Sequence, residues 1–129
     1  MIIGIDHIAL TVRSLEESVN FYTNMLSFEV EQRFEYKERG LTIQFLSIGE
    51  VQLELFGYSK EVAEQERKPL QAGIAHMAFE VDNLDETYVE LQKRGIKFEG
   101  EPRTAMMGQR ILFLSDPDGN RIELVEWRR

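Results

Sequence analysis

The feature that most constrains the fold is a repeat inside the chain. Residues 4–12, GIDHIALTV, recur as residues 73–81, GIAHMAFEV, and the chain's two histidines, His7 and His76, hold the same place in the two copies. The same offset of 69 residues relates Glu54 to Glu123. A repeat of this length predicts one supersecondary unit that occurs twice, so the fold is best interpreted as two copies of that unit.

Each copy begins with a strand, because residues 4–12 and 73–81 alternate between apolar side chains and the opposite face. A helix follows in both copies, with Ser14 or Asn83 as the N-cap and a glutamate three residues later. Three further strands complete each copy, at 28–36, 41–48 and 51–56 in the first and 97–100, 109–115 and 121–127 in the second. We therefore predict an α+β fold built from two tandem βαβββ modules.

The length of 129 residues is that of one domain. We expect module one at about residues 1–57 and module two at about 73–129. The connection, residues 58–72, is charged and poorly patterned, with a helical turn expected near 61–67.

Composition excludes several classes of protein. The chain has no cysteine, so it has neither a disulfide framework nor a thiolate metal site. Its net charge of −8 argues against non-specific binding to nucleic acid or to an anionic membrane. Neither a signal peptide nor an apolar run of membrane-spanning length is visible. We expect a cytoplasmic protein with a small-molecule partner.

The candidate ligands lie on the strand faces opposite the apolar ones. His7, Glu54, His76 and Glu123 would offer two imidazoles and two carboxylates. Such a set suits one divalent metal ion per site, Ni²⁺, Zn²⁺, Co²⁺, Mn²⁺ or Fe²⁺, and leaves room for water or substrate. A lone strand histidine is usually a structural residue and a lone glutamate usually faces solvent. Repetition of both residue types in one register favours the metal site.

Three further residues are candidates for substrate binding. Arg121 shares a strand face with Glu123 and is placed to meet a substrate carboxylate, unless it pairs with a neighbouring acid. Arg110 and Met107 belong to a segment expected to border the pocket, and an ordinary turn with apolar plugs is the alternative.

The sequence resembles the vicinal oxygen chelate superfamily, which includes glyoxalases, bleomycin resistance proteins and dioxygenases. The resemblance is carried by residues 7–10 (HIAL), 21–26 (FYTNML), 53–55 (LEL), 76–79 (HMAF) and 116–124 (DPDGNRIEL). It implies a single glyoxalase-like domain over residues 1–129, in which the two modules form a cupped mixed sheet with helices on the outside. It also implies a metal in the cup and a homodimer.

Within that superfamily the ligand order His, Glu, His, Glu is closest to that of glyoxalase I. The resemblance implies a lactoylglutathione lyase-like metalloenzyme, acting through a metal-stabilised enediolate, with Glu123 as the proton-shuttling base and Glu54 assisting. Thr11 and Tyr58 stand where bacterial glyoxalase I has an Arg and an Asn that hold glutathione.

Other members of the superfamily supply the alternatives. A methylmalonyl-CoA epimerase-like isomerase shares the proton shuttle but often has Gln at the position of Glu54. A ring-cleaving dioxygenase uses two His and one Glu with Fe²⁺. A resistance-type binding protein performs no chemistry and lacks the full ligand set.

Overall fold

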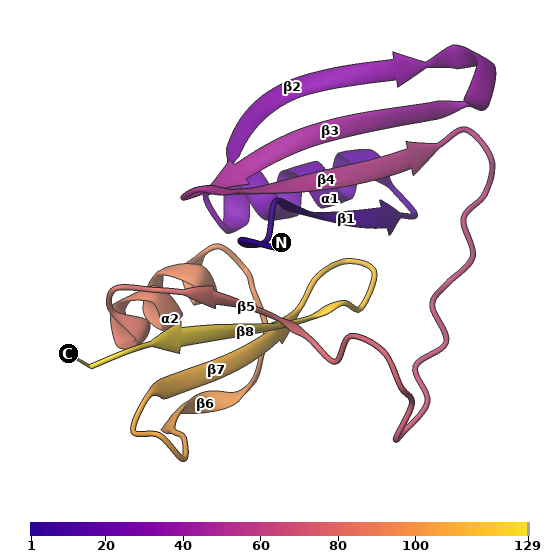
Figure 1. Cartoon of the computed structure of the whole chain (residues 1–129). Coiled ribbons are helices and arrows are strands. Elements are labelled where there is room, and N and C mark those ends of the chain that lie inside the picture. Colours follow the sequence, from indigo (N-terminus) through magenta and orange to yellow (C-terminus); the bar gives the residue numbers. More distant parts are fainter. Residues whose placement is uncertain (129) are drawn as a thin grey trace. The chain divides into compact units, whose positions relative to one another are not determined.

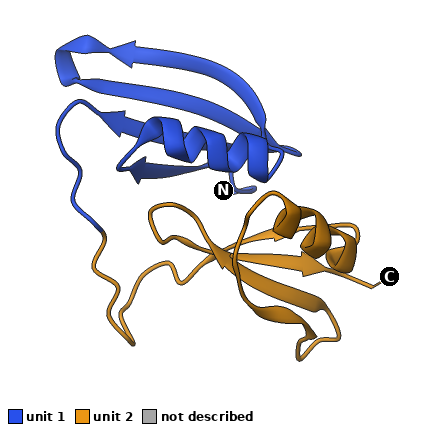
Figure 2. Cartoon of the chain, turned by 180° about the vertical axis from the view of Figure 1, so that it is seen from behind, with its two compact units in different colours: residues 1–64 blue, residues 65–129 orange. Residues whose placement is uncertain are grey.

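The computed structural model describes residues 1–128, and the chain divides into two compact units, residues 1–64 and 65–129 (Figures 1 and 2). The boundary falls inside the connection expected at residues 58–72. Each unit contains one four-stranded mixed sheet, which confirms the predicted α+β fold of tandem βαβββ modules. That the two units form a single domain stays a prediction.

The first unit has its strands in the order β1-β4-β3-β2, with β1 and β4 parallel and the other pairs antiparallel. Its elements are β1 (His7–Val12), α1 (Leu15–Asn20), a π-helical turn (Phe21–Met25), β2 (Glu29–Tyr36), a 3₁₀ turn (Lys37–Arg39), β3 (Leu41–Ile48) and β4 (Val51–Tyr58) (Figure 1).

The second unit repeats this order as β5-β8-β7-β6, again with the first pair parallel. Its elements are β5 (Met77–Glu80), α2 (Leu84–Lys93), β6 (Phe98–Thr104), β7 (Arg110–Ser115) and β8 (Arg121–Glu126). The two hairpins that precede β4 and β8 differ by one residue, because 48–51 join paired Ser47 and Gln52 whereas 116–120 join paired Ser115 and Arg121.

The helices begin where the sequence predicts. The Ser14 hydroxyl accepts a hydrogen bond from the backbone N–H of Glu17 at 3.3 Å, and the Asn83 amide oxygen accepts one from Glu86 at 3.1 Å. Each bond satisfies one of the donors that a helix N-terminus leaves without an intrahelical partner. Gly95 follows α2 with φ of +93°, as expected for a residue that ends a helix in the left-handed region.

In each unit the helix covers one face of the sheet (Figure 2). Leu55 of β4 and Leu124 of β8 are buried there, at 0% and 3% exposed. Burial of such a side chain contributes about 1.5–3 kcal/mol to folding. Gly57 allows α1 to approach β4, since a Cβ at this position would lie 2.9 Å from the Cβ of Leu15. The candidate ligands Glu54 and Glu123 project from the opposite face of each sheet.

Two expectations need correction. The helical turn near 61–67 was wrong, because these residues contain no helix in the structure. Their side chains are almost all exposed, so no apolar face stabilises a short helix there. The strand expected at 73–81 is restricted to β5, and His76 lies directly before it. No helix within residues 1–128 has the length and hydropathy needed to cross a membrane.

Candidate functional site

The first half-site consists of His7 on β1 and Glu54 on β4. The parallel register pairs Ala9 with Glu54, so His7, two residues earlier, projects from the same face as Glu54. The Nε2 of His7 lies 3.0 Å from Oε2 of Glu54. The Glu54 side chain is only 12% exposed, unlike the solvent-facing glutamate that a strand alternation usually implies.

Asp6 supports His7 from its other side. The Nδ1 of His7 donates to Oδ2 of Asp6 over 2.8 Å. This hydrogen bond, with a smaller contribution from the charge of Glu54, raises the pKa of His7 above its usual value. A proton held at Nδ1 leaves the Nε2 lone pair of the neutral ring directed toward Glu54, which is the tautomer that a metal ligand requires.

The second half-site consists of His76, directly before β5, and Glu123 on β8. Ala78 pairs with Glu123 just as Ala9 pairs with Glu54. The Nε2 of His76 lies 3.6 Å from Oε2 of Glu123, and the glutamate side chain is 17% exposed. The two histidines and two glutamates therefore form register-equivalent pairs, one pair in each unit.

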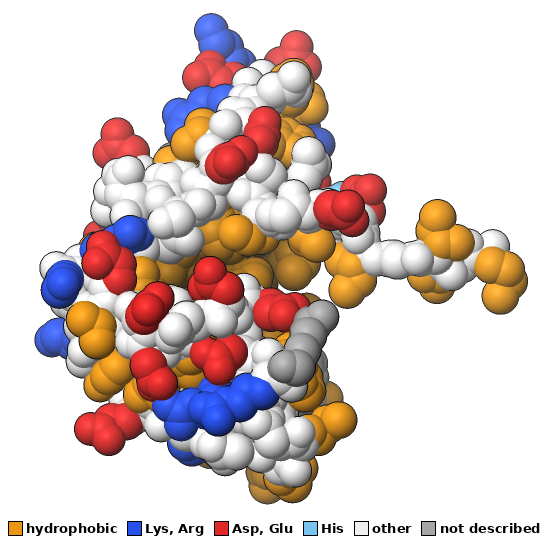
Figure 3. All heavy atoms as spheres, turned by 90° about the vertical axis from the view of Figure 1, so that its left-hand side faces the viewer, with side chains coloured by type: hydrophobic (Ala, Val, Ile, Leu, Met, Phe, Trp, Pro, Cys, Tyr) orange, Lys and Arg blue, Asp and Glu red, His pale blue; other side chains and the backbone are white. Residues whose placement is uncertain are grey.

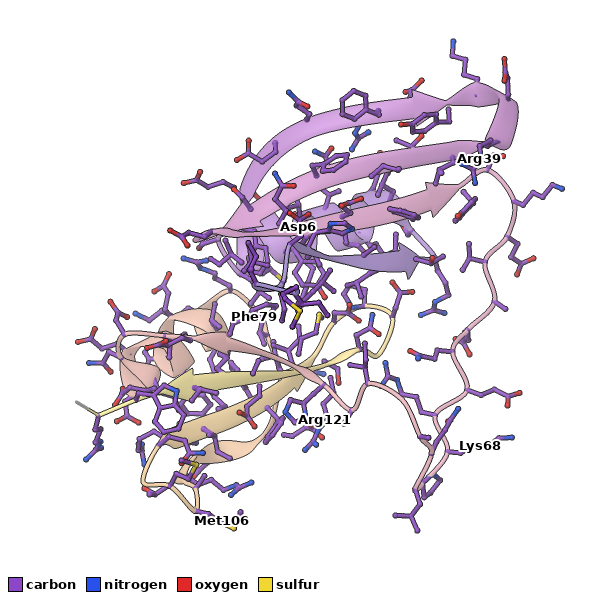
Figure 4. The ribbon with its side chains drawn as sticks, in the orientation of Figure 1. Asp6, Arg39, Lys68, Phe79, Met106 and Arg121 are labelled. Atoms are coloured by element: carbon purple, nitrogen blue, oxygen red, sulfur yellow. The ribbon has the colours of Figure 1, made fainter. Side chains whose placement is uncertain are left out.

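Arg121, labelled in Figure 4, lies on β8 two residues before Glu123, so strand alternation places it on the same face. Its Nε is 2.9 Å from Oε2 of Glu99. Arg121 therefore pairs with a neighbouring acid, which was the alternative to a role in substrate binding. Its Cζ lies 3.8 Å from the ring centroid of Phe113, within cation–π distance. The ring of Phe113 also meets that of His76 edge to face, with centroids 5.3 Å apart.

The structure does not bring Arg110 or Met107 to this group. The β7–β8 register sets Arg110 opposite Glu126, at the other end of the strand pair from Arg121. Arg110 projects from the helix-covered face and pairs with Asp85 of α2 at 2.6 Å. Met107 is exposed in the preceding turn, whose Met106 is labelled in Figure 4 far from Arg121.

The donor atoms fit a divalent cation. Two ligands bound to one ion at about 2.1 Å lie roughly 3.0–3.4 Å apart in neighbouring octahedral or tetrahedral positions. The N–O separation of 3.0 Å in the first half-site lies within this range, and the separation of 3.6 Å in the second lies slightly above it. Three or more metal-binding side chains are not grouped together anywhere within residues 1–128, so neither unit by itself supplies a full ligand set.

The surface charge argues against nucleic acid as a ligand. Acidic side chains are spread over the face seen in Figure 3, in keeping with the net charge of −8. A negative field of this kind concentrates cations and repels nucleic acid.

Sequence reasoning missed three members of the site: Asp6, Glu99 and Phe113. The sequence did offer a signal for Asp6. This acid directly precedes His7, whereas the equivalent residue before His76 is Ala75, so the two copies differ at this position. Phe113 and Glu99 gave no such signal, since their position beside Arg121 depends on the pairing of β6, β7 and β8.

Comparison with known proteins identifies the family. The sequence pattern of the Glyoxalase/Bleomycin resistance protein/Dioxygenase superfamily matches residues 4–124. The chain is 36% identical over 124 residues to the uncharacterized protein YwkD of Bacillus subtilis (strain 168), an alignment that covers 95% of this chain and 96% of that protein.

Several relatives carry functional names. The mitochondrial methylmalonyl-CoA epimerase of Homo sapiens is 28% identical over 118 residues, covering 88% of this chain and 67% of that protein. The structure of the trypanothione-dependent glyoxalase I of Leishmania major is similar with a TM-score of 0.75 and 27% identity, covering 93% of this chain and 84% of that one. Superfamily members commonly use a divalent metal ion, act on small molecules and often dimerise. The chain belongs to the Glyoxalase/Bleomycin resistance protein/Dioxygenase superfamily.

Proposed function

We propose that this protein is a divalent-metal-dependent lyase or isomerase of the glyoxalase I type, which moves a proton between adjacent carbons of a small molecule. The observation that carries the proposal is the pair of register-equivalent His–Glu contacts, with N–O separations of 3.0 Å and 3.6 Å. The ligand order along the chain, His7, Glu54, His76 and Glu123, supports the same assignment.

These four residues would hold one divalent ion per site, and Ni²⁺, Zn²⁺, Co²⁺, Mn²⁺ and Fe²⁺ all suit the nitrogen and oxygen donors. When bound, such an ion would supply polarisation of the substrate oxygens, which would make the neighbouring C–H more acidic. Glu123 takes the proton from one carbon and returns it to the next, because a carboxylate close to the substrate can serve as base and then as acid. Glu54 assists from the first half-site.

The proposal requires both half-sites at one ion, which the two modules of one chain or the modules of a homodimer would supply. Mixing His7→Ala and His76→Ala chains separates these arrangements. If the site forms within one chain, the mixture stays inactive, since neither chain has both histidines. If the site forms across a homodimer, hybrid dimers regain activity, because one of their two sites combines intact half-sites.

A methylmalonyl-CoA epimerase activity is the second candidate, and the 28% identity to the human mitochondrial enzyme favours it. Both candidates remove a proton from a carbon next to a polarised oxygen, but an epimerase returns it to the opposite face of the same carbon rather than to the adjacent one. They differ in substrate, so turnover assays with the methylglyoxal–glutathione hemithioacetal and with methylmalonyl-CoA distinguish them. Turnover of methylmalonyl-CoA alone would replace the first candidate with the second.

Metal analysis of the purified protein tests the site itself. We expect about one divalent ion per protomer and its loss in the His7→Ala, His76→Ala double variant. Circular dichroism of the variant would confirm that the fold is retained. A wild-type protein that holds no metal and cannot be reconstituted with any of the five ions would contradict the proposal and favour a binding protein without chemistry.

A further inference from the structure

Arg121 is held in a fixed orientation by two contacts within the second unit. Its Nε donates to Glu99 at 2.9 Å, and its guanidinium lies 3.8 Å above the centre of the Phe113 ring. Phe113 is itself buried at 9% exposed, so the surface on which the guanidinium rests is rigid. Because one edge and one face of the guanidinium are occupied, the side chain loses little freedom when the remaining donors bind a ligand.

The two Nη groups are the donors left over. Within residues 1–128, Glu99 is the residue to which Arg121 donates, and it does so through Nε. The side chain remains 43% exposed. Two Nη groups of one guanidinium present a planar fork, which matches the two oxygens of a carboxylate better than a single point charge does.

The position of this fork limits how far a bound carboxylate can lie from the reacting carbon of the same substrate. The guanidinium of Arg121 lies over the ring of Phe113, and Phe113 is the cross-strand partner of Glu123, so the guanidinium is held beside Glu123 on the same face of the sheet. A carboxylate at Arg121 therefore brings the next one or two carbons of the same molecule near Glu123.

We propose that Arg121, resting on Phe113, is the subsite for a substrate carboxylate that lies one or two carbons from the reacting C–H. The inference rests on the proposed function for the role of Glu123, and it narrows the substrate class to small carboxylic acids or their thioesters. Methylmalonyl-CoA has such a carboxylate, whereas the carboxylates of a glutathione adduct are several bonds from the reacting carbon.

The first unit provides an internal contrast. The register partner of Ser47 on β4 is Gln52, and the equivalent partner of Ser115 on β8 is Arg121. The first half-site therefore has a neutral amide where the second has a cation. The carboxylate subsite belongs to the second unit.

Titration of EDTA-treated protein with methylmalonate isolates Arg121 from any carboxylate binding to metal. We expect chemical-shift changes at the Arg121 Nε–H and the Phe113 ring, saturating with methylmalonate, and none with neutral dimethyl methylmalonate. Reduced glutathione is the second anionic probe and should bind at least several-fold more weakly than methylmalonate. Comparable binding of glutathione would assign the subsite to the carboxylates of a peptide thiol and overturn the small-acid assignment.

Three variants complete the test, each checked for an unchanged fold by its amide spectrum. Arg121→Gln should weaken methylmalonate binding on the order of tenfold or more, because a charge-assisted fork is lost. Arg121→Lys should fall between the wild type and Arg121→Gln, since lysine keeps the charge but not the planar fork. Arg94→Gln removes a half-buried cation that pairs with Glu90 at the end of α2 and should bind as the wild type does.

Equal affinity in wild type and Arg121→Gln, or an equal loss in Arg94→Gln, would overturn the subsite. If methylmalonate binding is weakened by Arg121→Gln but neither assay substrate is turned over, the subsite would be supported and the proposed function contradicted. If one of the substrates is turned over but Arg121→Gln leaves carboxylate binding unchanged, the proposed function would stand and the subsite would be contradicted.

Discussion

The two half-sites have the same candidate ligands on the same scaffold but different surroundings. In the first, Asp6 is not one of the candidate ligands, but its carboxylate accepts a hydrogen bond from Nδ1 of His7 at 2.8 Å. In the second, Ala75 occupies the position of Asp6, and the ring of His76 instead meets Phe113 edge to face. The internal repeat has preserved the candidate ligand residues, while the residues that contact them have diverged.

The neighbours of the two glutamates differ as well. Glu54 lies 3.0 Å from its histidine and Glu123 3.6 Å from its own, and Arg121 accompanies only Glu123. The first half-site thus resembles a supported metal anchor, and the second combines a looser carboxylate with a cation for substrate. This difference leads us to assign ligand holding chiefly to the first unit and proton transfer to the second.

The largest expected effect is on turnover. Glu123→Gln should lower kcat by about 10²–10⁴-fold, the usual contribution of a general base, and Glu54→Gln by clearly less. Steady-state kinetics on the substrate that is turned over would measure both, with bound metal determined for each variant. Equal losses in the two variants at equal metal content would show that the half-sites are functionally symmetric.

Truncation of equivalent core leucines compares the stability of the units. Leu55→Ala and Leu124→Ala remove side chains that are 0% and 3% exposed beneath the helices. Each should lower the free energy of unfolding by about 2–5 kcal/mol. Urea denaturation measures the loss, and hydrogen exchange resolved along the chain shows where it falls. Faster exchange in both units of one variant would mean that they unfold together.

Removal of the carboxylate beside His7 tests the first half-site as a supported anchor. Asp6→Ala should weaken divalent metal binding by about 10–100-fold, because a partner at the second ring nitrogen fixes the tautomer and orientation of a ligand histidine. Equilibrium dialysis with Zn²⁺ gives the affinity without reference to catalysis.

The matched substitution in the second unit is Ala75→Asp, which places an acid before His76. If it strengthens metal binding, the support that distinguishes the half-sites is transferable. Unchanged affinity in Asp6→Ala would contradict the supporting role of Asp6.

A smaller effect is expected at the helix N-termini, where the two units are alike. Ser14→Ala and Asn83→Ala each remove a side-chain acceptor for the N–H of the third helical residue. Each should cost about 1 kcal/mol of stability. Thermal or urea unfolding measures the change, and a threonine at either position should restore most of it. No loss on either substitution would mean that solvent caps these helices equally well.

The sequence predicted the elements that depend on local chemistry and on the repeat. Alternating side chains located the strands, and the caps at Ser14 and Asn83 located the helices. The shared offset of His7 to His76 and Glu54 to Glu123 identified pairs that the β1–β4 and β5–β8 registers then brought within 3.0 Å and 3.6 Å.

Contacts that depend on antiparallel pairing were not predictable in this way. The Arg121 contact with Glu99 requires the irregular register between β6 and β7, which shifts between Glu99 and Arg103. The displacement of Arg110 to the helix-covered face follows from strand alternation, but its expected role was inferred from sequence proximity to the turn. Proximity along the chain was the weaker guide, because side chains one position apart on a strand project to opposite faces.

The smallest expected effect concerns the protonation of His7. Its pKa is raised in the folded protein, chiefly by the hydrogen bond to Asp6 and secondarily by Glu54, so the ring in metal-free protein should titrate above pH 6.5. Because the folded pKa exceeds the unfolded one, the stabilisation that Asp6 gives to protonated His7 is fully present below about pH 6.5 and is lost as pH rises through the folded value.

Two measurements on metal-free protein check this sign. In an NMR titration the His7 ring signals should move to a lower midpoint in Asp6→Ala. In urea unfolding the wild type should exceed Asp6→Ala in stability by more at pH 5.5 than at pH 8.5. A difference that is constant with pH, or larger at pH 8.5, would show that Asp6 does not act through the charge of His7. Since Ala75 offers His76 no such partner, Ala75→Asp should create in the second unit the pH dependence that Asp6→Ala removes from the first.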